Sequence, residues 1–233
     1  MSGMDEIILV DKPAGMTSFG VVARLRRVLT EKVREEYRKR GETMPKRLKV
    51  GHTGTLDPFA TGLLIILVGK ATKKSDQFLK LDKEYEAEIR LGETSSTGDP
   101  EGIVQKTYSE KPILEDKIKN VVQEFVGEIE QKVPSFSAVK VNGERAYKLA
   151  RKGEEVETPV RKVKIYSIEV LEYKWPVLKI RTKVSSGTYI RTLGEDIGEK
   201  LGTGAYLTGL RRTRIDKYSV QDAKKIEDFG IFS

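Results

Sequence analysis

Several stretches of this chain have the apolar pattern of β-strands, and they limit the possible folds more than any other feature. In residues 83–92 (KEYEAEIRLG), Tyr, Ala, Ile and Leu alternate with charged residues, as in a strand buried on one face. Residues 177–187 alternate in the same way. Residues 63–69 (LLIILVG) form a short continuous apolar run, which is typical of a fully buried strand. The other strand candidates are 7–13, 162–173 and 204–215, and a shift of the apolar phase between Ile165 and Ile168 predicts a β-bulge.

Helical periodicity separates these strands. Residues 17–29 predict a helix capped by Thr17 or Ser18, and residues 113–127 predict an amphipathic helix. We expect two further helices, one at 188–202 capped by Thr188 and a short one at 219–229. Helices and strands alternate irregularly, and Asn142-Gly143 favours a hairpin turn. This order predicts the α+β class, with a large mixed or antiparallel sheet flanked by helices in one continuous domain.

Composition excludes several kinds of chemistry. The chain has 233 residues, no cysteine and one histidine, which rules out disulfides, thiolate nucleophiles and cysteine- or histidine-rich metal sites. A magnesium site built from carboxylates remains possible. The N-terminus lacks the pattern of a signal peptide, and the longest apolar run is far too short to span a bilayer. We therefore expect a cytoplasmic protein without a membrane partner.

Basic residues are concentrated in two places, within a formal net charge of +8. Residues 24–49 contain eleven basic and four acidic residues. The second group comprises Arg211, Arg212, Arg214 and Lys217. Such patches suggest a polyanionic partner, most often a nucleic acid, although a solvated helix face of mixed charge is the alternative for the first patch.

Few side chains remain that could carry catalysis. Residues 68–73 contain Gly-Lys without the glycine spacing of a P-loop, and no GxGxxG or GxSxG motif occurs. His52 could serve in a Ser-His-Asp triad, but only the presence of the three residue types supports this, because no GxSxG motif occurs. Asp57 stands in the Gly/Thr/Pro-rich segment GHTGTLDPFATG (51–62), and Arg191 stands at the start of a predicted helix. An aspartate can act as a nucleophile or a base, and a neighbouring arginine keeps it ionised, yet an isolated Asp-Pro pair is usually a turn former.

The chain resembles the TruB family of tRNA pseudouridine synthases in five blocks that follow in order and span nearly its whole length. The blocks are DKPAGMTSFGVV (11–22), VGHTGTLDPFATGLLIILVGKATK (50–73), KEYEAEIRLGETSSTGDPEG (83–102), VPSFSAVKVNGERAYKLARKG (133–153) and SSGTYIRTLGEDIGEKLGTGAYLTGLRRTRI (185–215). The second block also resembles RNA-guided relatives of the family, but Thr53 and the run Phe59-Ala60-Thr61 favour the stand-alone bacterial kind.

The resemblance implies a pseudouridine synthase fold with a central catalytic cleft, and Asp57 as the catalytic aspartate. The family isomerises uridine 55 in the T loop of tRNA: it flips the base, breaks the glycosidic bond and rejoins the uracil through C5, without metal or cofactor. Asp57 would attack the ribose or the uracil ring, or remove a ribose proton. Arg191 would pair with Asp57. Tyr85 would stack on the uracil and assist proton removal at C5, although plain core packing would also suit its place on an apolar strand face.

The resemblance implies further contacts with the substrate. Tyr189 and Leu210 would line the uracil pocket, Lys12 would brace the site near the aspartate, and Asp99 would lie near the same cleft. His52 would stack against RNA rather than move protons, with a purely structural histidine as the alternative.

The chain departs from the family pattern at two places. Residues 31–47 form a basic insertion, either an extension of the first helix or a mobile arm that touches RNA phosphates. The chain also stops soon after the last block, where many members continue into a PUA-type RNA-binding domain. Either the protein lacks that domain or the sequence is truncated before it. We expect residues 1–233 to be a single catalytic domain without a PUA domain, acting as a monomer on the T stem-loop of tRNA without guide RNA.

Three other functions compete with this one. A non-enzymatic protein that binds or folds RNA would not require Asp57, Tyr85 and Arg191 together. A guide-dependent subunit acting on ribosomal RNA would be inactive without its guide. A metal-dependent nuclease is disfavoured because acidic ligands do not cluster in the sequence.

Overall fold

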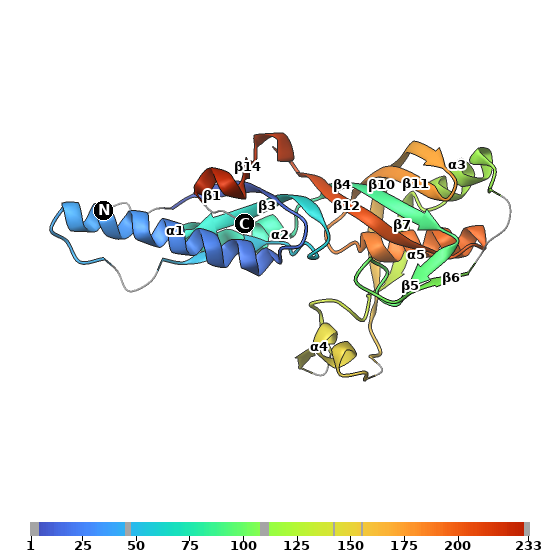
Figure 1. The fold of residues 1–233 in the computed structure, drawn as a ribbon, viewed down its shortest axis with the longest axis horizontal. Coiled ribbons are helices and arrows are strands. Elements are labelled where there is room, and N and C mark those ends of the chain that lie inside the picture. The colour runs from blue at the N-terminus through green and yellow to red at the C-terminus, as the bar shows by residue number, and fades with distance from the viewer. Residues whose placement is uncertain (1–4, 45–47, 108–111, 142, 155, 231–233) are drawn as a thin grey trace. The chain divides into compact units, whose positions relative to one another are not determined.

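The computed structural model describes residues 5–44, 48–107, 112–141, 143–154 and 156–230 (Figure 1). The chain forms two compact units. The first unit comprises Met1–Lys83 and Arg211–Ser233, and the second comprises Glu84–Leu210. This division does not test whether residues 1–233 form a single domain, which stays a prediction.

The first unit contains a mixed sheet centred on β3 (Thr61–Val68). β3 is antiparallel to β1 (Ile7–Lys12) and β2 (Val50–Thr53), and parallel to the last part of β12 (Ala205–Ile215). Its smaller elements are β13 (Tyr218–Ser219), β14 (Lys224–Lys225), α2 (Ser75–Leu79) and the 3₁₀ turns η1 (Gly69–Lys74), η2 (Val220–Asp222) and η3 (Ile226–Phe229).

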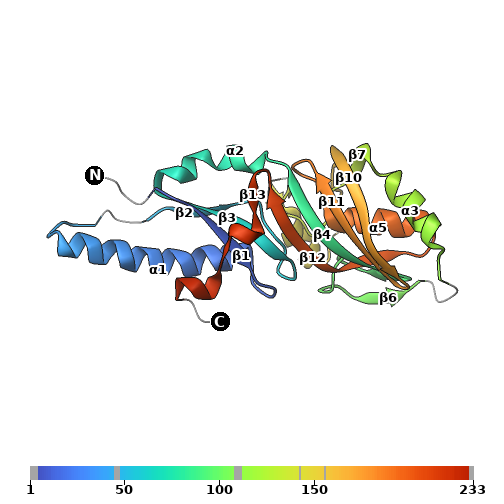
Figure 2. The same cartoon turned by 90° about the horizontal axis from the view of Figure 1, so that it is seen from above.

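Both faces of β3 are buried, as its continuous apolar run predicts. The long helix α1 (Ser18–Lys39) packs on one face, where Leu64 and Ile66 meet Val22 and Leu25. On the other face, Leu63, Ile65 and Leu67 form a cluster with Phe78 of α2 and with Ile215. Figure 2 shows α1 and α2 on opposite sides of these strands. Burial of β3 on both sides anchors the segment that precedes it, which contains Asp57.

The second unit contains a sheet in the order β12-β4-β11-β10-β7. Its strands are β4 (Lys83–Leu91), β11 (Val177–Val184), β10 (Val160–Lys174) and β7 (Gly127–Lys132), with the first part of β12. The helices α3 (Glu115–Gln123) and α5 (Ile190–Leu201) pack against each other, and they contact β10 and β7 respectively (Figure 2). Smaller elements are the pairs β5 (Glu93–Ser95) with β6 (Val104–Lys106) and β8 (Lys140–Val141) with β9 (Glu144–Arg145), and the helix α4 (Ala146–Arg151).

Several predictions about individual elements are confirmed. The apolar residues of β4 are buried at every second position. The register of β10 against β11 shifts between Ile165 and Ser167, which is the predicted bulge. Thr17 caps α1, because its hydroxyl oxygen accepts the N–H of Gly20 at 2.9 Å. The α+β class with mixed and antiparallel sheets flanked by helices is likewise confirmed.

Two helix predictions need correction. Thr188 does not cap α5, because its hydroxyl donates to the Ser185 carbonyl instead and Tyr189 occupies the N-cap position. Residues 219–229 are not one helix, because β14 pairs with β1 there and holds the chain extended between two 3₁₀ turns. Asn142, half of the predicted hairpin turn, lies outside the described residues.

The first helix is longer than predicted. α1 continues to Lys39, so residues 31–39 of the basic insertion extend the helix rather than form a mobile arm. Residues 45–47 of the insertion lie outside the described residues. Among the helices described, none is both long and apolar enough to cross a membrane.

Candidate active site

The segment that carries Asp57 is held in place through its main chain. The buried hydroxyl of Ser18, at the start of α1, accepts the N–H of Leu56 at 2.8 Å and donates to the Leu56 carbonyl at 3.0 Å. The Ala60 N–H donates to the Asp57 carbonyl at 3.1 Å and closes a turn over Pro58. Leu56, the residue before the aspartate, is therefore bonded to the helix. The side chain of Asp57 takes no part in these bonds and is partly exposed.

Lys12 joins the end of β1 to the same segment. Its fully buried ammonium group donates to the carbonyls of Pro13 (2.8 Å), Met16 (2.6 Å) and Pro58 (3.1 Å). The Gly15 N–H donates to the same Pro58 carbonyl at 2.8 Å. Burying an ammonium group costs free energy unless its donors are satisfied. Here the acceptors are main-chain carbonyls of the segment after β1 and of the segment that contains Asp57. The structure thus places Lys12 beside the loop of the predicted catalytic aspartate.

Arg212 of β12 supports this loop, a structural role that its place in the second basic group of the sequence did not indicate. Its guanidinium donates from Nε to the Leu63 carbonyl at 2.7 Å and from Nη2 to the Gly54 carbonyl at 3.1 Å, and the side chain is 1% exposed. At Gly62, a Cβ atom would lie 2.3 Å from the Arg212 carbonyl oxygen, so only glycine fits there.

The second basic group is therefore only partly available to a polyanion. Arg212 is buried, and Arg211 forms an ion pair with Asp11 at 2.7 Å. Arg214 and Lys217 are exposed. Of the four cations in this group, Arg212 is therefore buried and Arg211 is paired with Asp11, and the polyanion partner suggested by the group stays a prediction. A signal was present in the sequence, since the strand pattern of 204–215 alternates its side chains between two faces.

His52 lies on β2 opposite Ile66 and is half-buried. Burial lowers the pKa of its imidazole, and the positive charge of Arg212 lowers it further, so the ring is neutral at pH 7. Its Nδ1 atom is buried, and no hydrogen-bond partner for it exists among the described residues. A neutral, half-buried imidazole of this kind is compatible with a contact residue.

In the second unit, Arg191 projects from the first turn of α5 and is buried. Its Nη1 donates to the Thr97 carbonyl at 2.9 Å and to Asp99 Oδ2 at 3.0 Å, and its Nη2 donates to the Phe136 carbonyl at 2.7 Å. Asp99 is also buried, and its Oδ1 accepts the Thr97 hydroxyl at 2.6 Å. The structure thus brings two predicted site residues, Arg191 and Asp99, into one ion pair.

Tyr189 immediately precedes α5, and a buried glutamine fixes its main chain. Gln131 of β7 accepts the Tyr189 N–H at 3.0 Å and donates to the Tyr189 carbonyl at 3.1 Å. Sequence reasoning missed Gln131, and the available signal was a polar residue on the opposite face of β7 from Glu128, Glu130 and Lys132. Tyr85 is 8% exposed on the apolar face of β4, and Leu210 is half-buried at the last position of this unit on β12.

Asp57, His52 and Lys12 thus belong to the first unit, whereas Tyr85, Asp99, Tyr189, Arg191 and Leu210 belong to the second. The pairing of Asp57 with Arg191 and the shared cleft stay predictions, because their residues belong to different units. Within the described ranges, no group of three or more His, Cys, Asp or Glu side chains is placed to hold a metal ion.

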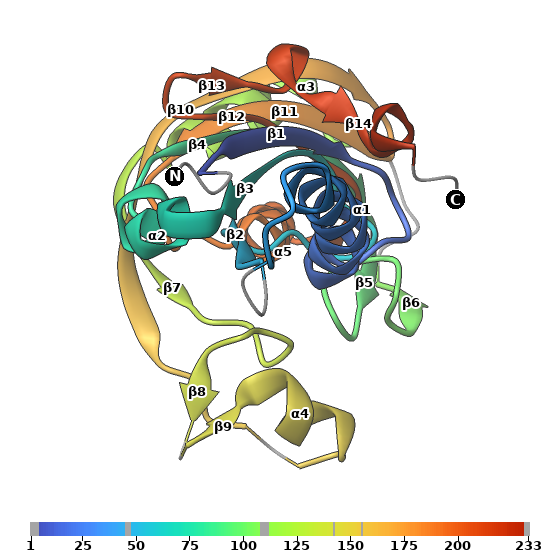
Figure 3. The ribbon, with the colours of Figure 1, turned by 90° about the vertical axis from the view of Figure 1, so that its left-hand side faces the viewer.

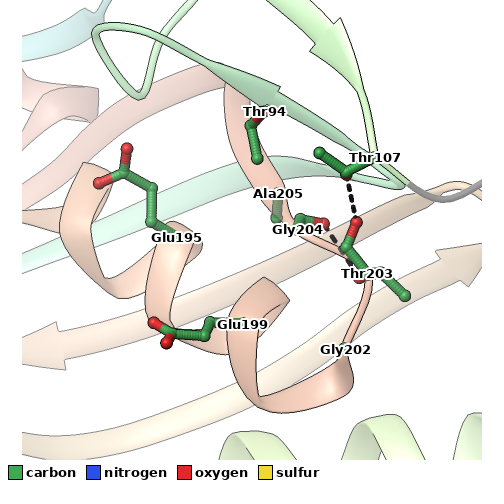
Figure 4. Close-up of a pocket in the computed structure, with 8 residues that line it drawn as sticks. All are labelled: Thr94, Thr107, Glu195, Glu199, Gly202, Thr203, Gly204 and Ala205. Carbon is green, nitrogen blue, oxygen red and sulfur yellow. Dashed lines mark hydrogen bonds between the residues drawn. The ribbon is translucent and has the colours of Figure 1, made fainter.

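A pocket of about 440 Å³ opens in the second unit beside the end of α5, and none of the predicted site residues lines it. Figure 4 shows Glu195 and Glu199 of α5 opposite Thr94 and Thr107, with Thr107 bonded to Thr203. Burial raises the pKa of Glu195 to about 7; the Arg191 charge lowers it, whereas the like charges of Asp196 and Asp99 raise it.

Family models match most of the chain. Residues 40–190 match the model of the TruB family pseudouridylate synthase N-terminal domain, and residues 191–230 match that of the tRNA pseudouridylate synthase B C-terminal domain.

Individual relatives agree with these matches. The tRNA pseudouridine synthase B of Phocaeicola vulgatus is 45% identical over 96% of this chain and 91% of that protein. The protein of the same name from Aquifex aeolicus is 45% identical over 97% of this chain and 74% of that protein.

Solved structures share the fold. One is a Cbf5-Nop10-Gar1 complex, with a TM-score of 0.68 and 33% identity over 95% of this chain. Another is an H/ACA RNP bound to a substrate RNA containing 2′-deoxyuridine, with a TM-score of 0.67 and 31% identity over 95% of this chain. The present chain spans about half the length of the matched chain in each. The chain belongs to the TruB family of pseudouridylate synthases.

Proposed function

We propose that this protein isomerises uridine to pseudouridine at position 55 in the T loop of tRNA, with Asp57 as the catalytic aspartate. Its family membership supports the reaction, and the name that its relatives share supports tRNA as the substrate. The observation that carries the assignment of Asp57 is the fixed main chain on both sides of it, held by Ser18 and Lys12.

The reaction exchanges one bond of the ribose for another. The target base leaves the folded loop, at a cost of a few kcal/mol. The bond between ribose C1′ and uracil N1 then breaks, the uracil turns over, and C1′ bonds to C5. The proton on C5 leaves and N1 gains a proton, so that the product has the composition of the substrate.

The residues take the following parts in the proposal. The Asp57 carboxylate acts on the ribose or the uracil ring, Arg191 pairs with it and keeps it ionised, and Tyr85 stacks on the uracil. Tyr189 and Leu210 line the uracil pocket.

The buried Arg191–Asp99 pair supports this arrangement, because it holds the guanidinium in one orientation through three acceptors. An arginine fixed in this way presents its charge without reorganising during the reaction.

Contacts with the rest of the RNA complete the proposal. His52 stacks on bases exposed by flipping, an interaction worth roughly 1–3 kcal/mol per base. If His52 only stacks, activity should change little across the range in which its imidazole titrates, which lies below the ordinary pKa of 6.5; a clear loss of activity that follows this titration would refute the stacking role. We further propose that the protein acts as a monomer in the cytoplasm, without guide RNA.

The test uses a T-arm RNA hairpin with tritium at uracil C5 and no added metal or guide. We expect the native protein to release tritium and Asp57→Asn to release none. Asp76→Asn, which removes an exposed carboxylate on α2 of the same unit, should release it normally. Release by Asp57→Asn would refute the assigned residue.

A native protein that binds the hairpin and full-length tRNA but releases no tritium from either would refute the proposed reaction. It would favour a protein that only binds or folds RNA, or one that requires a guide.

A further inference from the structure

The second half of α1 contributes little to the core of the first unit. The core-facing side of the helix ends at Val33, and no side chain of residues 34–40 is buried. Figure 3 shows α1 nearly end-on beside β1 and β3, with a broad side turned away from them. Core packing therefore does not explain why the helix continues to Lys39.

Three arginines lie along that outer side. At 3.6 residues per turn, Arg27, Arg34 and Arg38 fall within about 20° of one line, on the side opposite to the buried Leu25. All three are exposed. Glu31 lies near the same line, but one carboxylate offsets only one of the three positive charges. The stripe formed by Arg27, Arg34 and Arg38 therefore keeps a net positive charge.

The neighbouring cations of the helix are neutralised, whereas the stripe is not. Lys39 pairs with Glu35 at 3.8 Å and Arg40 pairs with Glu36 at 3.9 Å. Among the described residues, no carboxylate forms an ion pair with any arginine of the stripe, although Glu31 lies between them in the sequence. The stripe therefore presents positive charge that no ion pair within the described part of the chain neutralises.

The chemistry of the stripe fits phosphate. A guanidinium offers a planar set of donors that matches phosphate oxygens, and it is less strongly hydrated than an ammonium group. With a rise of 1.5 Å per residue, the arginines are roughly 10 Å and 6 Å apart along the axis, so each can reach a different phosphate. Contacts of this kind fix the register of a nucleic acid without reading its sequence.

We propose that the outer stripe of α1, formed by Arg27, Arg34 and Arg38, docks on the phosphate backbone of the substrate tRNA. The proposal rests on the proposed function for the identity of the RNA. It assigns the stripe to binding and not to chemistry.

The test measures the binding of full-length tRNA between 50 and 200 mM salt, together with the steady-state kinetics of pseudouridine formation. The log of the association constant decreases linearly with the log of the salt concentration. In Arg27→Gln/Arg34→Gln/Arg38→Gln, this slope should become shallower by about 2 to 3 if every arginine releases counterions. KM should rise with little change in kcat. The matching triple lysine variant should keep most of the slope.

A control separates docking from net charge. Lys119→Gln/Lys179→Gln/Lys200→Gln removes three exposed cations that are already paired with Glu115, Glu172 and Glu124. It should leave the slope nearly unchanged. Equal slopes for the arginine variant and the native protein, or equal losses in both triple variants, would overturn the docking proposal while leaving the enzyme's activity intact. Failure of the proposed function would appear separately, as a native protein without pseudouridine formation.

Discussion

The hydroxyl of Ser18 bonds both main-chain polar groups of Leu56, at 2.8 Å to the N–H and 3.0 Å to the carbonyl. These residues are 38 positions apart in the sequence. Through this contact, the start of α1 determines the path of the chain immediately before Asp57. A side chain that acts on the proposed catalytic aspartate only through the backbone can be tested apart from one that touches the substrate.

Ser18→Ala should reduce both stability and kcat. The substitution leaves a buried N–H and a buried carbonyl without a partner, which costs roughly 1–3 kcal/mol. Thr17→Ala is the matched control, because it removes the cap of the same helix at a cost of about 1 kcal/mol but makes no bond to Leu56. Urea unfolding and kcat should be measured for both. If kcat falls equally in the two variants, the positioning role of Ser18 is wrong.

Gly62→Ala should prevent stable folding of the first unit. Gly62 has φ +102°, which favours glycine, and an added Cβ would lie 2.3 Å from the Arg212 carbonyl oxygen. The clash is with main-chain atoms of Arg212, so a shift of the backbone would be needed to relieve it. Gly51→Ala, in the same segment, should cost far less because no atom lies within 4 Å of its Cβ position. Thermal unfolding followed by circular dichroism compares them. A Gly62→Ala protein as stable as Gly51→Ala would contradict the close approach of Gly62 and Arg212.

Asp99→Asn should destabilise the second unit by about 3–5 kcal/mol, because it breaks the buried ion pair between Arg191 and Asp99. Glu35→Gln, which breaks an exposed pair on α1, should cost less than about 1 kcal/mol. Denaturant unfolding gives both values. Similar small losses of unfolding free energy in the two variants would mean that the second unit tolerates the buried Arg191 without the charge of Asp99.

Glu195 should make the protein more stable below neutral pH than above it. Its folded-state pKa of about 7 exceeds its ordinary 4.5, so the folded state binds more protons between these values. The stabilisation is fully present below pH 4.5 and is lost as the pH rises towards 7. Asp196, whose pKa is raised to about 6 by burial and by Glu199, acts in the same direction.

Glu195→Gln should therefore flatten the pH dependence of the unfolding free energy between pH 5 and 8. Glu128→Gln, an exposed carboxylate on β7, is the control and should leave that dependence as it is. An unchanged profile in Glu195→Gln would show that this carboxyl group titrates normally in the folded protein.

Local patterns predicted much of the architecture, because burial imposes a period on the sequence wherever an element has an apolar face. The alternation in β4, the fully apolar β3 and the phase shift in β10 each follow from which side of a strand meets the core. The end of the chain was harder to predict: residues 219–229 have helix-compatible composition, but pairing of β14 with β1 overrides that local preference.

For the candidate site, the family and the residues proposed to act follow from the sequence blocks around Asp57, Tyr85 and Arg191. The contacts that fix the main chain around these residues are visible only in the folded protein. Ser18, Arg212 and Gln131 are ordinary polar residues in sequence, and their roles depend on bonds to main-chain groups far along the chain. The physical reason is that a hydrogen bond to a backbone carbonyl or N–H depends on position and not on the identity of the partner residue, so it leaves no pattern in the sequence.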